Sequence, residues 1–271
     1  MRKMKILLFG GSGFLGAALR DIYLLEKKVQ LICHYRHDFS LEDLSAIQFF
    51  LEKHSPDIVI NLSAVINFQD ECNLSSLLAV NVLAPSIMSQ WCALEGRLFF
   101  HASTILIHGK NVQIASPNTE INIDSSYGHS KYLAEKMILD SGARSQIVRF
   151  SGIWGKDGPT HLGINKALQD VINGKTLKFE GGVYLRNYIH VKCAAFIIKK
   201  IVESRDVGIY YAASPRAISI SEMLKAISHK FKSPAPIELP SHKKGYNQIV
   251  EVSENLKSEI LDFYQAIESY F

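Results

Sequence analysis

Tyr127 and Lys131 stand four positions apart in the segment SSYGHSKYLAEKMI, residues 125–138. On a helix this spacing places both side chains on one face. A free tyrosine titrates near pH 10, which is too high for a base, and a lysine cation one turn away favours the phenolate and lowers that pKa. Such a pair can pass a proton to or from a ligand oxygen. The alternative is an ordinary solvated helix face, so the rest of the chain has to decide.

A glycine pattern near the start of the chain points to a nucleotide. Gly10, Gly13 and Gly16 lie between an apolar run at 4–10 and a helical pattern at 14–28. Glycines there allow a tight turn, let the backbone approach a pyrophosphate and let the helix pack closely on the strand. The helix N-terminus also favours phosphate charge. The alternative is plain turn glycines, but the position directly after the first strand favours a nucleotide site.

Strand and helix patterns alternate five times, which predicts an α/β, Rossmann-type doubly wound parallel sheet. Ligands bind beyond the carboxyl ends of such strands, and the candidate residues do follow strands. Ser40 should cap the helix at 41–54, with Asp43 as an acidic variant of the capping box. Gly96 should end the helix at 73–96. The predicted strands are 4–10, 29–35, 56–64, 97–103 and 145–151, and the predicted helices between them are 14–28, 41–54, 73–96 and 132–142.

The pattern loosens after residue 150, which indicates a second, smaller unit. We expect residues 1–150 to form the dinucleotide-binding domain, with 186–212 returning to it. Residues 151–185 and 213–271 should form a small C-terminal substrate-binding lobe over the strand ends. Its predicted elements, with those that return to the sheet, are helices at 164–174, 191–204 and 219–231 (the last with a serine cap), a strand at 208–214 and an exposed proline-rich loop at 233–245.

Composition narrows the class of partner. The 271 residues are 47% hydrophobic and 21% charged, as in a folded globular protein. The net charge of +4 comes from scattered residues, 30 Lys and Arg against 26 Asp and Glu. That excess is too weak for a nucleic-acid surface and fits an anionic small ligand. The sequence therefore predicts a small-molecule partner and no nucleic acid.

Cysteine usage and the N-terminus predict a cytoplasmic protein. The four cysteines are far apart, without a C-x-x-C pair, and are expected to be reduced thiols. The basic, apolar start of the chain is similar to a secretory signal, but GGSG interrupts it. No apolar run approaches the roughly 20 residues of a membrane helix, so no membrane partner is expected. The cysteines are Cys33, Cys72, Cys92 and Cys193.

Six segments, in this order, resemble the short-chain dehydrogenase/reductase superfamily, in particular its extended class that processes nucleotide sugars. The glycine spacing is that of the superfamily, and the match extends from residue 10 to residue 191. In the last segment Asn187 replaces the aspartate of the family pattern. The segments are the glycines at 10–16, NLSAV at 61–65, STILIHG at 103–109, YGHSK at 127–131, RFSGIWG at 149–155 and LRNYIHV at 185–191.

The resemblance implies hydride transfer between a nicotinamide cofactor and a sugar carbon. Tyr127 would be the proton donor to the sugar oxygen, and Lys131 would tune it and hold the nicotinamide ribose. Thr104, with Ser103 beside it, would hydrogen-bond the same oxygen. Arg186 would contact the diphosphate of a nucleotide sugar, where a planar guanidinium suits phosphate; the alternative is a surface arginine.

The resemblance also assigns a set of binding residues. The catalytic set is Thr104, Tyr127 and Lys131, and the substrate-binding set is Ser103, Thr104, Ser151, Gly152 and Arg186. The cofactor-binding set is Gly10, Ser12, Gly13, Phe14, Leu15, Gly16, Arg36, Asp38, Phe39, Leu62, Ser63, Ala64, Asn81, Lys131 and Phe150.

The segment CHYRHDFS decides between the two nicotinamide cofactors. An acid at the end of the second strand binds the ribose 2′-hydroxyl of NAD, and a base accepts the 2′-phosphate of NADP. Arg36 and His37 favour NADP, while Asp38 leaves NAD open. Cys33, His34 and His37 are too few for a zinc site, so no metal is expected.

Three functions stay open within the class. Ile105 and Leu106 stand where dehydratases carry Asp-Glu, and because they cannot transfer protons, dehydration is not expected. Ile105 also stands where the epimerase–reductases of the fucose pathway carry a cysteine, so that match fails. The short chain, the HDFS segment and Arg36 favour a reductase of a 4-keto sugar, nearest in features to dTDP-4-dehydrorhamnose reductase-like enzymes. The form of LRNYIHV favours a 4-epimerase with tightly bound NAD. A non-catalytic NADP-binding regulator is the third alternative.

Two expectations concern helix surfaces. The resemblance implies a homodimer through the helices at 73–96 and 127–142. Leu133, Met137 and Ile138 should form the buried stripe that holds Tyr127 and Lys131 in place.

Overall fold

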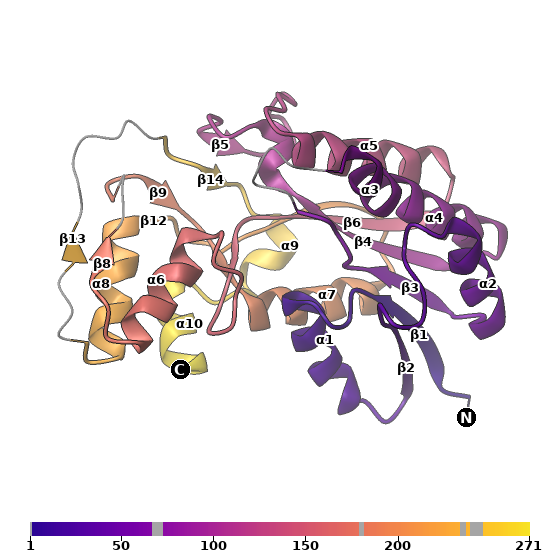
Figure 1. The fold of residues 1–271 in the computed structure, drawn as a ribbon, viewed down its shortest axis with the longest axis horizontal. Coiled ribbons are helices and arrows are strands. Elements are labelled where there is room, and N and C mark those ends of the chain that lie inside the picture. The colour runs from indigo at the N-terminus through magenta and orange to yellow at the C-terminus, as the bar shows by residue number, and fades with distance from the viewer. Residues whose placement is uncertain (1, 67–72, 179–181, 234–236, 239–245) are drawn as a thin grey trace.

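The computed structural model confirms the predicted doubly wound parallel sheet (Figure 1). It describes residues 2–66, 73–178, 182–233, 237–238 and 246–271. Six strands pair in parallel in the order β11-β6-β4-β3-β1-β2. The order reverses between β1 and β3, which is the switch point where such sheets bind ligands. The strands are β1 (Met4–Phe9), β2 (Val29–His34), β3 (Ile58–Asn61), β4 (Leu98–Thr104), β6 (Arg144–Phe150) and β11 (Gly208–Ala212).

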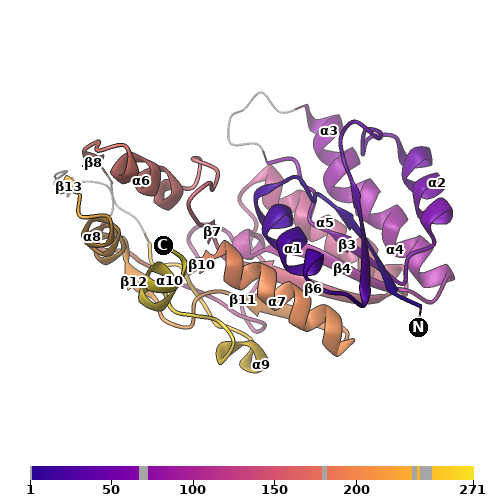
Figure 2. The same ribbon diagram turned by 90° about the horizontal axis from the view of Figure 1, so that it is seen from below.

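The central strands are apolar on both faces because helices cover both. In β1, Ile6 and Leu8 pack into a cluster with α1 and α7, whereas Leu7 and Phe9 pack into another with α2 and α4. Figures 1 and 2 show α1 and α7 on one side of the sheet and α2, α4 and α5 on the other. This two-sided burial explains the continuous apolar runs in the sequence. The helices are α1 (Phe14–Leu24), α2 (Leu44–His54), α4 (Ala84–Leu94), α5 (Ser126–Asp140) and α7 (Val191–Ser204).

A second cluster of helices forms a smaller lobe beside the strand ends (Figure 1). Its core contains Trp154, Leu168, Met223 and Phe263. Much of the predicted loop at 233–245 lies outside the described residues. The remaining elements of the chain, of which β5, β10, β14 and α9 contribute buried residues to the main core, are α6 (Gly163–Ile172), α8 (Ile220–Lys230), α9 (Glu254–Lys257), α10 (Phe263–Tyr270) and the short strands β5 (Ile114–Ala115), β7 (Ile153–Trp154), β8 (Leu177–Lys178), β9 (Leu185–Arg186), β10 (Ile189–His190), β12 (Ile218–Ser219), β13 (Ile237–Glu238) and β14 (Ile249–Val250).

Two predicted helix starts have different outcomes. The serine cap of α8 is confirmed, since the Ser219 hydroxyl accepts the Glu222 N–H at 3.2 Å and the Glu222 carboxylate accepts the Ser219 N–H at 2.8 Å. The predicted Ser40 cap of α2 is wrong. The helix begins later, at Leu44, where the Asp43 carboxylate accepts the Ala46 N–H at 3.0 Å. Aspartate occupies the cap because Ser40 is used one turn earlier, in a local bond to Glu42.

The single helix predicted at 73–96 is three segments. These are α3 (Leu74–Leu78), a π-helical turn η1 (Ala79–Leu83) and α4, and Gly96 follows with the left-handed φ of +64° predicted for a helix end. Among the described residues, Leu74–Leu94 is also the one segment long and apolar enough to cross a membrane, so the statement that no run approaches that length is wrong. Most of its apolar window, 61%, is buried inside the protein, as in a core helix.

The cap of α2 gives the first prediction. Asp43→Ala should lower the free energy of unfolding by about 1 kcal/mol, because it removes the acceptor for a backbone N–H in the first turn. Ser40→Ala should change it by less than about 0.5 kcal/mol. Urea unfolding followed by circular dichroism measures both values, and a larger loss in Ser40→Ala would contradict the observed helix start.

Candidate active site

The glycine turn between β1 and α1 brings two backbone segments into direct contact. Gly10 has a φ of +84°, and a Cβ there would lie 2.7 Å from the backbone N of Ser63. A Cβ on Gly16 would lie 2.0 Å from the Gly10 carbonyl oxygen. Gly13 is the N-cap of α1 and carries no side chain to cover the helix end. The turn therefore has the shape of a cradle for a dinucleotide phosphate, which side chains would fill.

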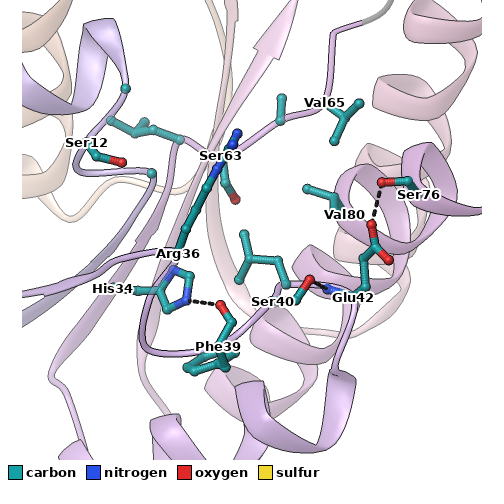
Figure 3. A pocket seen from close by; sticks show the side chains of 15 residues that line it. Ser12, His34, Arg36, Phe39, Ser40, Glu42, Ser63, Val65, Ser76 and Val80 are labelled. Atoms are coloured by element: carbon teal, nitrogen blue, oxygen red, sulfur yellow. Dashed lines mark hydrogen bonds between the residues drawn. The ribbon is translucent and has the colours of Figure 1, made fainter. Parts of the chain in front are cut away.

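A cavity of about 470 Å³ lies at the carboxyl ends of β1, β2 and β3 (Figure 3). It occupies the switch point of the sheet, where the chain leaves β1 and β3 in opposite directions. The predicted cofactor residues in its lining are Gly10, Ser12, Gly13, Arg36, Phe39, Leu62, Ser63 and Ala64. Val65, the last residue of the predicted segment NLSAV, also lines it, and the lining residues that sequence reasoning missed are His34, Ser40, Leu41, Glu42, Ser76 and Val80.

The turn after β2 separates the two groups that bear on cofactor choice. Arg36 lines the cavity. The Asp38 carboxylate turns back and accepts the backbone N–H of Tyr35 at 2.7 Å, within its own turn. The described geometry therefore offers a guanidinium to the cavity and engages the carboxylate elsewhere.

Glu42 and Ser76 meet across the cavity lining. The Ser76 hydroxyl donates to Glu42 Oε1 at 2.5 Å, and this bond joins α3 to the segment before α2 (Figure 3). The two residues are 34 positions apart. Local pattern carries no signal for such a contact, which is why the sequence analysis missed it.

Asn81, a predicted cofactor residue, lies behind the cavity wall. Its amide accepts the Val65 N–H at 2.7 Å and donates to the Val65 carbonyl at 2.8 Å and to the Ser130 hydroxyl at 3.0 Å. Asn81 is fully buried in η1, and the wider π-helical turn sets its direction. It therefore ties the turn after β3 to α5.

Other predicted cofactor residues also lie outside the cavity lining that the structure describes. Phe14 and Leu15 are half-buried in the first turn of α1. Phe150 is the last residue of β6 and is 3% exposed in the main core.

The three predicted catalytic residues come from two neighbouring elements. Tyr127 and Lys131 lie in α5, which starts at Ser125. Thr104 ends β4 and caps a 3₁₀ turn, η2 (Ile105–His108). A Cβ on Gly128 would lie 3.0 Å from the Leu106 carbonyl oxygen, so the first turn of α5 packs directly on η2. The structure thus places the tyrosine turn beside the end of β4.

The pKa relation predicted for Tyr127 and Lys131 is wrong in this structure. Burial raises the pKa of Tyr127 to about 12 and lowers that of Lys131 to about 7. The physical reason is desolvation, which disfavours both charged forms. Lys131 Nζ lies 2.9 Å from Nε2 of His101, a buried residue of β4 that sequence reasoning also missed.

A buried network of charges lies on the same face of α5. Arg149 Nη2 is 2.7 Å from Glu135 Oε2, and the Ser103 hydroxyl, predicted for substrate, donates to the other oxygen of Glu135. Arg149 also donates to the Tyr211 hydroxyl, which bonds His108 Nε2 at 2.9 Å. Two features of the sequence indicate this network: Arg149 is a charged residue within the apolar strand QIVRF, and Glu135 follows Lys131 by one helical turn.

The buried stripe predicted for α5 is wrong at Leu133, which is 45% exposed. Met137 is half-buried and Ile138 is buried. The helix faces the sheet with small and polar side chains, because Lys131 and Glu135 reach partners in β4 and β6. The buried set is Gly128, Ser130, Lys131, Ala134, Glu135 and Ile138.

The predicted substrate residues Ser151, Gly152 and Arg186 lie where the small lobe meets the sheet. The Ser151 hydroxyl donates to the Asn187 carbonyl at 3.0 Å. A Cβ on Gly152 would lie 2.6 Å from the Tyr188 ring, so only glycine fits there. Arg186 Nη1 donates to the carbonyl oxygens of Leu185 at 2.8 Å and Tyr246 at 2.5 Å.

Asn187 replaces the aspartate of the family pattern for a visible reason. Its amide nitrogen donates to the carbonyls of Ser214 and Val250, and its amide oxygen accepts the Val250 N–H, each at 3.0 Å. A carboxylate could not make the two donations. As for metals, no group of three or more His, Cys, Asp or Glu suited to an ion occurs among the described residues.

Comparisons with known proteins identify the family and the fold. The family described as RmlD substrate binding domain matches residues 4–253. The spore coat polysaccharide biosynthesis protein SpsK of Bacillus subtilis (strain 168) is 28% identical over 159 residues, 57% of this chain and 55% of that protein. The chain thus aligns with about half the length of this curated relative.

Solved structures show the same fold at low identity. A dTDP-4-dehydrorhamnose reductase from Bacillus anthracis str. Ames, in complex with NADP, has a TM-score of 0.86 and 16% identity, with 99% of each chain covered. A UDP-glucose 4-epimerase from Thermotoga maritima, with UDP-glucose, has a TM-score of 0.81 and 17% identity, with 98% of each chain covered. Both share the architecture described above.

The charge network gives the second prediction. Glu135→Leu should lower the free energy of unfolding by about 3–5 kcal/mol, because it leaves the Arg149 guanidinium buried without its carboxylate. Adding Arg149→Met should recover most of that loss, since an apolar pair can replace a buried ion pair. Chemical unfolding of the wild type and both variants measures the difference. A double variant no more stable than Glu135→Leu would contradict the dependence of Arg149 on Glu135.

Proposed function

The chain belongs to the family described as RmlD substrate binding domain, and we propose that it reduces the 4-keto group of a nucleotide-linked sugar with a nicotinamide cofactor. The fold shared with an NADP-bound dTDP-4-dehydrorhamnose reductase supports this proposal. The 28% sequence identity to a spore coat polysaccharide biosynthesis protein supports it as well. The glycine cradle and the cavity at the switch point fit the dinucleotide.

One observation favours reduction over epimerisation. Arg36 lines the cavity, and a base after the second strand favours NADP, the cofactor pool on which reductases draw. A reductase needs a proton donor at Tyr127, and a tyrosine phenol carries its proton at neutral pH.

The proposed mechanism assigns a task to each of four residues. Lys131 would hold the ribose of a bound nicotinamide, which would supply the hydride for the carbonyl carbon. Tyr127 gives its phenolic proton to the carbonyl oxygen, which becomes the hydroxyl of the product. The Thr104 hydroxyl donates a hydrogen bond to the same oxygen and thereby stabilises the charge that develops on it. Arg186, at the edge of the small lobe, binds the diphosphate of the sugar nucleotide.

We propose NADP as the cofactor because Arg36 lines the cavity and Asp38 is engaged in its own turn. We also propose a cytoplasmic location, in line with the free thiols of Cys33, Cys92 and Cys193; Cys72 lies outside the described residues. A homodimer through α4 and α5 is supported by Leu133 and Leu139, each 45% exposed on α5.

The activity gives the third prediction. NADPH absorbance should fall when the protein is mixed with a nucleotide-linked 4-keto sugar from a panel of such substrates. Tyr127→Phe should lower kcat by about 10²–10⁴-fold and leave NADPH binding unchanged, because only the proton donor is lost. Interconversion of sugar isomers without net NADPH loss would instead establish an epimerase. NADPH binding without turnover of any sugar would establish the regulator.

Cofactor choice gives the fourth prediction. Arg36→Ala should raise the Kd for NADPH by at least about tenfold and leave that for NADH nearly unchanged, because a charge-assisted bond to the 2′-phosphate is lost. Fluorescence titration measures both constants. Asp38→Asn tests the other reading, because a selective loss of NADH affinity would show that this carboxylate binds the ribose and would overturn the preference for NADP.

A further inference from the structure

Glu42 carries the one carboxylate among the described residues that line the cavity at the switch point. Its Oε1 accepts the Ser76 hydroxyl at 2.5 Å, so the carboxylate is held between the segment before α2 and helix α3. An acid in this cavity repels the phosphates of a dinucleotide unless it lies away from them. It also needs a group of the ligand that donates a hydrogen bond, since carboxylate oxygens only accept.

The phosphate end of the cavity lies away from Glu42. The glycine turn at Gly10 and Gly13 lines the cavity and leads into the N-terminus of α1, where phosphate charge is favoured. Figure 3 shows Ser12 of this turn on one side of the cavity and Glu42 with Ser76 on the other. A pyrophosphate in the glycine turn therefore leaves the Glu42 side of the cavity for another part of the cofactor.

The order of the strands assigns that part to the adenosine half. In the sheet, β4 lies on one side of β1 and β2 lies on the other. The proposed hydride transfer takes place beside Thr104, at the end of β4, so the nicotinamide half of the cofactor points toward β4. The adenosine half then lies along the segment after β2, which carries both Arg36 and Glu42.

The surroundings of Glu42 fit a purine base. Leu41, Val65 and Val80 are apolar lining residues, and Figure 3 shows the two valines on the same side of the cavity as Glu42. A base has apolar faces and carries its polar atoms on its edge, so apolar walls with one fixed polar group match it. Arg36, by contrast, is a cation and suits the 2′-phosphate of the ribose.

The chemistry of the carboxylate selects one group on that base. The amino group of adenine donates hydrogen bonds, whereas its ring nitrogens accept them. Asp38, the other acid after β2, is engaged in its own turn, where it accepts the Tyr35 N–H at 2.7 Å. Glu42 is therefore the acid of this segment that is available to an amino group inside the cavity.

We propose that Glu42 determines specificity for the base of the cofactor by accepting a hydrogen bond from the amino group of adenine, and that Ser76 is the positioning residue that holds its carboxylate. The inference rests on the proposed function, because it takes a nicotinamide dinucleotide as the ligand. It extends that function to the end of the cofactor that is remote from the reacting carbon. A base without the amino group leaves the carboxylate unpaired, and such a base is bound less tightly.

The analogue of NADPH in which hypoxanthine replaces adenine tests the proposal. Hypoxanthine has a carbonyl oxygen in place of the amino group, and its ring N–H lies on the next atom, so it cannot replace that donor unless the base moves. Fluorescence titration of the full chain measures both dissociation constants. The Kd of the hypoxanthine analogue should be at least about tenfold higher than that of NADPH. Equal constants in the wild type would overturn the proposal.

Glu42→Gln should remove this preference. An amide donates as well as accepts, so the ratio of the two constants should fall to about one or below. The ratio is the right measure, because both cofactors carry the same phosphates and the loss of charge affects them equally. Glu52→Gln is the matched control. It removes an exposed acid of α2 that bonds Gln48, outside the described cavity lining, and should keep the wild-type ratio.

Ser76→Ala tests the positioning role. Without the hydroxyl the carboxylate can turn away from the base, so the ratio should fall by at least about threefold. Ser75→Ala is the matched control, because the Ser75 hydroxyl donates to Asn73 at 2.5 Å and not to Glu42. The ratio in Ser75→Ala should equal that of the wild type.

Other outcomes separate this inference from the proposed function. If Glu42→Gln raises both constants by the same factor, the carboxylate binds a ribose hydroxyl and the inference is wrong. It is also wrong if Asp38→Asn, and not Glu42→Gln, removes the preference. A chain that reduces a sugar but binds both cofactors equally loses only this inference. A chain that shows the preference and turns over no sugar loses the reductase function alone, and a chain that binds neither cofactor loses both.

Discussion

The rest of the site depends on one constraint, the burial of charged side chains of α5 against an apolar parallel sheet. Lys131 and Glu135 are both almost inaccessible to water. Buried charges are stable only when they are neutralised or paired. The structure uses both solutions, since Glu135 pairs with Arg149 of β6 and Lys131 meets the imidazole of His101 in β4. The two neighbouring strands therefore carry polar side chains at positions where a purely structural sheet would be apolar.

This constraint explains how the fold and the chemistry are combined. The alternation of strands and helices builds a sheet whose order reverses between β1 and β3, and the cavity lies at that point. The polar face of α5 lies over β4 and β6, one strand further along the sheet. The Asn61 amide joins the two regions, because it bonds to the turn beside the cavity and to His101.

Local sequence pattern predicted two parts of this structure, the alternation of strands and helices and the turn whose glycines have a fixed spacing. The alternating elements, the cradle at Gly10 and Gly16 and the residues that end β1 and β3 were all found from local pattern. Contacts between distant segments could not be found in this way. The partners of Lys131, the bond between Glu42 and Ser76 and the exposure of Leu133 depend on which strands become neighbours. The pKa relation of Tyr127 failed for the same reason, because burial acts through the whole fold.

The number of residues in the π-helical turn η1 affects the geometry of the site. Asn81 lies within η1 and holds the turn after β3 and Ser130 of α5 at once. Each residue of an α-helix turns the chain by about 100°, since 3.6 residues complete a turn. A deletion of one residue here would restore a regular α-helix and rotate Asn81 away from its partners. The number of residues in η1 therefore matters to the cavity wall in addition to the identity of Asn81.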